Sequence, residues 1–119
     1  MTASGPVALV KRYHAALNHF DAAVITPMFA AEATYTSPSV GVLRGRDAIV
    51  AAMESYFTEF PDQVAEDETV ELVAPNTVRC EWRLNATSTA TGQPSVRRGV
   101  ETLVLTEDGR ILTIEVEDR

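Results

Sequence analysis

Residues 78–86, with the sequence VRCEWRLNA, alternate between apolar and polar side chains. The apolar set would point to one face of a strand and the charged and polar residues between them to the other. Alternation with a period of two is typical of a strand that is buried on one face. The segment therefore predicts a long strand in a sheet whose apolar face packs against other elements. That apolar set is Val78, Cys80, Trp82, Leu84 and Ala86.

Further strands are expected on both sides of this segment. Residues 64–73 precede it, and Pro75-Asn76 is expected to turn the chain between the two strands. Residues 96–106 and 110–117 follow it, and a tight hairpin at 107–109 is expected to join them. In the first half of the chain we expect one short strand at 34–36 and a loop at 41–45.

Three helices are expected in the first half of the chain. The first begins near Pro6, because proline is favoured at the first helical position. Asp21 can cap a short second helix, and Asp47 suits the first turn of a third. Helices followed by strands predict an α+β fold, with a curved sheet wrapped around the helices and one domain over residues 1–119. The apolar stripe of the first helix contains Val10, Tyr13, Leu17 and Phe20.

The composition argues against several classes of partner. A net charge of -7 disfavours nucleic acid, which requires a basic surface, and also anionic membranes. The chain contains no run of 18 or more apolar residues that would span a bilayer, and its first residues, MTASGPV, do not resemble a signal peptide. The single cysteine excludes an internal disulfide bond. We therefore expect a cytoplasmic protein that binds neither nucleic acid nor membranes.

Few residues are suited to holding a metal or a cofactor. His14 and His19 are the two histidines, and both are expected at the surface or boundary of the first helix. Neither belongs to a His-x-x-x-His pair, and Cys80 is expected to be a core thiol. The chain also lacks a glycine-rich phosphate-binding loop. The sequence therefore predicts no metal and no cofactor.

Two polar side chains are expected to point into the apolar interior. Glu101 shares a strand face with Leu103; if it is buried without a cation, desolvation raises its pKa, and the neutral acid can donate a hydrogen bond. Tyr13 lies within the apolar stripe of the first helix, so its hydroxyl group needs a partner. Structural roles remain open for both residues. Glu101 would then lie at a strand end or pair with Arg97 or Arg98, and Tyr13 would bond to a backbone carbonyl group.

Five segments spanning nearly the whole chain form a family pattern. They are VKRYHAALNHFD at 10–21, MFAAEATYTSPS at 28–39, LRGRDAIVAAMESYF at 43–57, VRCEWRLNATSTATGQP at 78–94 and RGVETLVLTEDGRI at 98–111. In this order they resemble the SnoaL-like branch of the nuclear transport factor 2-like superfamily, which includes the ketosteroid isomerases. The resemblance implies a cystatin-like cone, an α+β barrel with an apolar pocket open at one end. It does not specify a reaction, because the superfamily includes isomerases, cyclases, dehydratases, epoxide hydrolases and non-catalytic scaffolds.

The resemblance also implies roles for individual positions. In the isomerases, a tyrosine of the first helix and a protonated acid of a late strand hold the oxyanion, and these fall on Tyr13 and Glu101. The aspartate that shuttles the proton falls on Ser37, so the usual base is missing. Its loss would reduce the rate by about 10²–10⁴-fold, which argues against efficient steroid isomerisation. Asp118 on the last strand corresponds to an acid of some SnoaL-type cyclases and could reach the pocket mouth.

Two functions remain open at this point. One is an isomerase- or cyclase-type enzyme acting on an apolar carbonyl compound, polyketide- or steroid-like, with Ser37, Asp118 or water replacing the base. The other is a non-catalytic module that binds a ligand in the same cavity or dimerises. The family resemblance favours a homodimer formed through the outer face of the sheet. The pocket is expected to be lined by Tyr35, Met53, Phe57, Trp82, Leu84, Ala86, Leu103 and Ile114.

Overall fold

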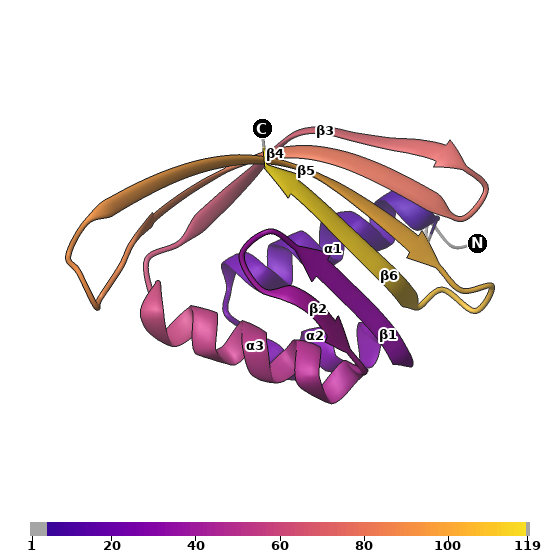
Figure 1. Cartoon of the computed structure of the whole chain (residues 1–119). Coiled ribbons are helices and arrows are strands. Elements are labelled where there is room, and N and C mark those ends of the chain that lie inside the picture. The colour runs from indigo at the N-terminus through magenta and orange to yellow at the C-terminus, as the bar shows by residue number, and fades with distance from the viewer. Residues whose placement is uncertain (1–4, 119) are drawn as a thin grey trace.

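A curved six-stranded sheet arches over three helices in the computed structural model, which describes residues 5–118 (Figure 1). This arrangement confirms the predicted α+β cone. The helices are α1 (Pro6–Asn18), α2 (Ala22–Ile25) and α3 (Arg46–Glu59), with a 3₁₀ turn, η1 (Thr26–Met28), after α2. The strands are β1 (Phe29–Ser37), β2 (Gly41–Arg44), β3 (Val64–Ala74), β4 (Thr77–Thr87), β5 (Pro94–Leu105) and β6 (Ile111–Asp118).

The sheet is mixed, with the strand order β2-β1-β6-β5-β4-β3. Strands β3 to β6 form an antiparallel meander, in which each strand pairs with the next along the chain. Strand β1 lies parallel to β6 and carries β2 antiparallel on its other side. The N-terminal hairpin is thereby placed beside the C-terminal strand, and this pairing brings segments from both halves of the chain to one cavity.

The β1–β2 hairpin differs from the sequence prediction. Strand β1 is longer than the expected strand at 34–36, and the expected loop at 41–45 contains β2. Gly41 has a φ of 73°, a left-handed conformation that glycine adopts readily and that turns the chain back along β1. Ser37 then pairs with Gly41, and Tyr35 with Leu43. A strand as short as β2 shows too few alternations to be recognised from sequence.

The predicted helix signals are confirmed. Pro6 occupies the start of α1, and Asp47 lies in the first turn of α3. The Asp21 carboxylate accepts a hydrogen bond from the Val24 backbone N–H at 3.2 Å and so caps α2. None of the described helices is both long and apolar enough to cross a membrane.

The apolar core and the interior cavity adjoin within the space enclosed by the sheet, and Tyr13, Ile49 and Val116 belong to both. Side chains from α1, α2, α3, β1, β4, β5 and β6 form the core. On α3 only Ile49 is buried, whereas Met53 and Phe57 are partly buried; they line the cavity and pack against the core. Fully buried core residues include Val10, Phe29, Val78, Leu103, Ile111 and Ile114.

Candidate functional site

A cavity of about 180 Å³ lies between the inner face of the sheet and helices α1 and α3. Most of its wall is apolar or aromatic, and a small set of polar groups faces it. This combination is typical of sites that bind small molecules, in which polar groups orient an otherwise apolar ligand. The polar and ionisable residues of the wall include Tyr13, His14, Tyr35, Ser37, Tyr56, Gln63, Asp67, Arg97 and Glu101.

The expected lining residues divide into two groups. The first group does line the cavity: Tyr35, Met53, Phe57, Trp82 and Leu84. For Ala86, Leu103 and Ile114 the expectation is wrong, since none of them belongs to the wall. Leu103 and Ile114 are completely buried in the apolar core, and Ala86 lies beyond Leu84 toward the end of β4. The alternation placed all three on the inner face correctly, but the cavity covers only part of that face.

Glu101 points inward from β5, as predicted, and is 4% exposed. The condition attached to its predicted role as a neutral donor is not met, because a cationic partner is present. One carboxylate oxygen, Oε1, lies 2.7 Å from Nε2 of His14 on α1. The pair joins the first helix to the middle of the sheet across the edge of the cavity.

His14 was expected at the surface or boundary of the helix, and this expectation is wrong: the residue is buried between two carboxylates. Its Nδ1 lies 2.8 and 3.0 Å from the two carboxylate oxygens of Asp67 on β3. Burial by itself lowers the pKa of His14, but the charge of Glu101 and the bonds to Asp67 and Glu101 outweigh it and raise the pKa to about 10. At pH 7 the ring is therefore an imidazolium that donates one N–H to each carboxylate.

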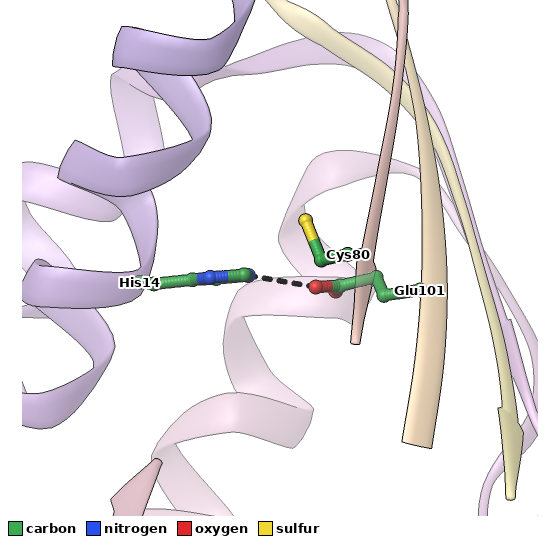
Figure 2. A group of neighbouring side chains, drawn as sticks. All are labelled: His14, Cys80 and Glu101. Atoms are coloured by element: carbon green, nitrogen blue, oxygen red, sulfur yellow. Dashed lines mark hydrogen bonds and ion pairs between the residues drawn. The ribbon is translucent and has the colours of Figure 1, made fainter. Parts of the chain in front are cut away.

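Cys80 on β4 lies beside the His14–Glu101 pair (Figure 2). One possible ligand atom from each of the three residues lies within 4.8 Å of the others. A metal would require a thiolate and a neutral imidazole. Burial and the charges of Glu101 and Asp67 raise the pKa of the thiol, and Nε2 of His14 is already bonded to Glu101. The described geometry thus fits a protonated hydrogen-bond network better than a metal site, and the absence of a metal remains a prediction.

Two tyrosines place hydroxyl groups at the cavity. Tyr13 is 1% exposed, and burial followed by the charge of Glu101 raises its pKa well above the usual value of 10. Burial, and then the same carboxylate, also raise the pKa of Tyr35. Both side chains are therefore neutral phenols that can donate a hydrogen bond. Within the described part of the chain, neither phenol is hydrogen-bonded to another residue, so both remain available to a ligand.

The remaining two catalytic candidates lie in different surroundings. Ser37 is buried in the cavity wall; its hydroxyl group is 3.1 Å from that of Ser39 and accepts a bond from the Val40 N–H. No basic side chain is bonded to it among residues 5–118. The expectation that Asp118 reaches the pocket mouth is wrong, because its side chain is 54% exposed and does not line the cavity. It forms an ion pair with Arg97, which does line the cavity.

Sequence reasoning missed His14, Asp67 and Arg97 as members of the site. His14 directly follows Tyr13 on α1, but it lies one step off the apolar stripe. Asp67 stands within the acidic stretch Glu66-Asp67-Glu68, where the pattern does not distinguish one face of the strand from the other. Arg97 lies four residues before Glu101, at a spacing that puts both on the same face of β5. This spacing was the available signal for Arg97.

Several solved structures have the same fold as this chain. One is a proposed SnoaL-like polyketide cyclase from Jannaschia sp. CCS1, with a TM-score of 0.85 and 15% identity over 99% of this chain and 89% of that chain. Another is SalBIII, an epoxide hydrolase/cyclase-like enzyme in pyran ring formation of the polyether salinomycin. Its TM-score is 0.82, with 21% identity over 93% of this chain and 88% of that chain. A third is an uncharacterised cystatin-fold protein from Novosphingobium aromaticivorans, with a TM-score of 0.84 and 16% identity over 94% of this chain and 97% of that chain.

At these low identities the structural similarity shows the fold alone. No curated protein matches the chain significantly in sequence. The family model for the SnoaL-like domain, however, matches residues 10–114, which is most of the chain and includes Tyr13, His14 and Glu101. The chain therefore belongs to the SnoaL-like domain family.

Proposed function

We propose that this protein is an isomerase- or cyclase-type enzyme that acts on a small apolar carbonyl compound, polyketide- or steroid-like, with Glu101 as its general base. The observation that carries the proposal is the buried ion pair between His14 and Glu101 in the cavity wall. A position on β1 that holds a base in related isomerases is occupied here by Ser37. The carboxylate of Glu101 supplies a base from β5, two strands away from β1 in the same sheet.

One carboxylate oxygen of Glu101 is hydrogen-bonded within the protein, and the other is available to a ligand. Oε1 accepts a bond from His14, and Oε2 has no hydrogen-bond partner among the described residues. Oε2 would remove a proton from a carbon next to the substrate carbonyl group. His14 and Asp67 hold the carboxylate in position, as a base must lie within hydrogen-bond reach of the proton that it removes.

Tyr13 would stabilise the negative charge that moves onto the carbonyl oxygen as the proton leaves. A buried neutral phenol in a largely apolar cavity wall is an effective donor to such an oxygen. Return of the proton from Glu101 to a different carbon completes an isomerisation. If the carbanion instead attacks a second carbonyl carbon, a C–C bond closes a ring, and the new alkoxide takes the proton from Glu101. The apolar wall favours a compact, folded substrate in either case.

Exchange of the substrate's acidic hydrogens with deuterium tests this base directly, without knowledge of the product. The assay follows a panel of cyclic enones and 1,3-diketones in D₂O by NMR. We expect the wild type to accelerate exchange and Glu101→Gln to lose about 10²–10⁴-fold of that acceleration. Glutamine keeps the size of the side chain and an oxygen that can accept from His14. Glu117→Gln on the exposed part of β6 is the matched control and should exchange at the wild-type rate.

The same experiment separates the enzyme from a non-catalytic module. The observation that favours such a module is Ser37, whose hydroxyl group is engaged with Ser39 and has no basic partner among the described residues. Compounds that bind in the cavity while wild type and Glu101→Gln exchange equally would refute the enzymatic proposal. A homodimer formed through the outer sheet face remains a separate prediction, which light scattering in solution tests.

A further inference from the structure

Arg97 is a cation in the wall of the cavity. It lies on the inner face of β5, four residues before Glu101, and pairs across the sheet with Leu84 of β4. Four residues of strand correspond to a backbone rise of roughly 13 Å. The wall therefore carries a carboxylate at one position and a guanidinium group about one ligand length away, with Trp82 at the register between them.

The guanidinium group is only partly used by the protein. Its Nη2 donates to Oδ1 of Asp118 at 3.0 Å, and Arg97 has no other bonding partner among the described residues. A guanidinium group has five N–H donors, so most of them remain free. The side chain of Asp118 is 54% exposed and that of Arg97 is 30% exposed, and ion pairs of such exposure hold weakly. A carboxylate already fits this position, and it is held loosely enough to be replaced.

The other cation of the described cavity wall has no donors to spare. His14 donates its two N–H groups to Asp67 and Glu101. Tyr35 and Tyr56 also line the cavity near Arg97, whose charge offsets part of the rise that burial causes in the pKa of each phenol. Free N–H groups beside two neutral phenols form a cluster of donors, and the half-exposed carboxylate of Asp118 is the one acceptor bonded to it among the described residues. A ligand in the cavity is the natural source of further acceptors.

We propose that Arg97 binds a carboxylate group of the ligand, with Asp118 as the group that the ligand displaces. Planar guanidinium and carboxylate groups match in a two-bond arrangement, which favours this acid over other acceptors. The inference deepens the proposed function: the substrate is an apolar carbonyl compound whose carboxylate lies roughly one four-residue strand spacing, about 13 Å, from the carbon that Glu101 deprotonates. The binding half of the inference stands without the chemistry of Glu101.

Calorimetric binding of biphenyl-4-carboxylate and its methyl ester tests the inference. Both probes are rigid and apolar, and they differ in charge at one end. We expect the acid to bind the wild type about tenfold more tightly than the ester, and Arg97→Gln to remove this preference while ester affinity stays unchanged. Asp118→Asn should strengthen acid binding, because it removes the competing carboxylate. Arg98→Gln, an exposed neighbour paired distantly with Glu68, is the matched control and should keep the preference.

The outcomes separate this inference from the proposed function. Equal binding of acid and ester by the wild type overturns the carboxylate site, as does an equal loss of both in folded Arg97→Gln. If Arg97→Gln does not fold, Arg97→Lys keeps the charge without the planar fork and should retain only part of the preference. If the wild type binds acid and ester equally but still shows Glu101-dependent deuterium exchange, this inference alone is overturned. If the wild type prefers the acid but wild type and Glu101→Gln exchange deuterium equally, the proposed function is overturned and Arg97 stands as a binding residue.

Discussion

The inner face of strands β4 and β5 covers two regions that differ in chemistry, an apolar core and a partly buried cavity wall. Residues on this face pair across the two strands as Val78 with Leu103, Cys80 with Glu101, Trp82 with Gly99 and Leu84 with Arg97. The first pair is completely buried in the apolar core. Each of the other three pairs contributes at least one residue to the cavity wall, namely Glu101, Trp82, Leu84 and Arg97. Leu103 and Glu101 are two residues apart on β5 and almost equally buried, but one is apolar and the other carries a carboxylate.

This difference shows that burial and partner are separate requirements. Leu103 needs only apolar neighbours, whereas Glu101 needs a hydrogen-bond partner and a counter-charge, because a buried unpaired carboxylate is costly. Helix α1 supplies both through His14, and β3 holds His14 through Asp67. The polar region is therefore an arrangement of three elements, while the apolar region depends on close packing. Variants in each region should consequently fail in different ways.

The largest effect is expected from removing one member of the buried pair. His14→Leu leaves the Glu101 carboxylate buried without its cation, and we expect a loss of about 3–5 kcal/mol in the free energy of unfolding. The measurement is urea denaturation. His19→Leu, at the exposed end of α1, is the control and should change stability by less than about 0.5 kcal/mol.

The double variant His14→Leu/Glu101→Leu sharpens this comparison by making the polar region resemble the core. Replacing a buried pair with apolar residues of similar volume is often neutral for stability. We therefore expect the double variant to regain most of the stability lost in His14→Leu, while deuterium exchange is lost. A single variant as stable as wild type, or a double variant less stable than the single, would contradict the ion pair.

A slightly smaller effect is expected in the apolar region. Leu103→Ala removes a completely buried side chain, and the resulting void should lower the free energy of unfolding by about 2–5 kcal/mol. Ligand affinity measured below the unfolding transition should not change, because Leu103 lies outside the cavity wall. A ligand that binds much more weakly to the folded variant would show that the two regions are not separate.

The smallest of these effects is expected at the boundary between the regions. A Cβ atom on Gly99 would lie 2.6 Å from the indole ring of Trp82, which lines the cavity. Gly99→Ala must displace this ring, and we expect it to lower stability by about 1–3 kcal/mol and to weaken binding of ring compounds. Trp82→Phe in the same background should recover stability, since the smaller ring leaves room. Calorimetry and urea denaturation check both effects, and equal affinities in wild type and Gly99→Ala would refute the contact.

The sequence predicted much of the fold because its patterns are local. Period-two alternation placed Glu101 and Leu103 on one buried face, and the helical stripe placed Tyr13 inside. The cavity boundary was beyond this reasoning. Leu103 and Leu84 both lie on the inner face, and only the packing of α1 and α3 decides which of them meets the core and which meets the cavity.

The polar site was predicted only in part, because its members are joined across the chain. His14 and Asp67 are 53 residues apart, and His14 and Glu101 are 87 apart. A stripe of apolar residues defines the buried face of a helix, so His14 beside it was assigned to the boundary. Arg97 was considered as a partner of Glu101, but the register pairs β5 with β6 so that Arg97 meets Asp118 near the chain end.

The central claim is that His14 is an imidazolium held between two carboxylates, and ¹⁵N NMR of its ring during a pH titration tests it most directly. In the folded protein the pKa of His14 is raised above its usual value of 6.5 to about 10. The positive charge of the ring should therefore persist past neutrality, and its ion pairs with Glu101 and Asp67 should be lost only as pH rises toward about 10. Both ring nitrogens should therefore carry protons at pH 8. A ring that loses its proton near pH 6.5 in the folded protein would contradict the account.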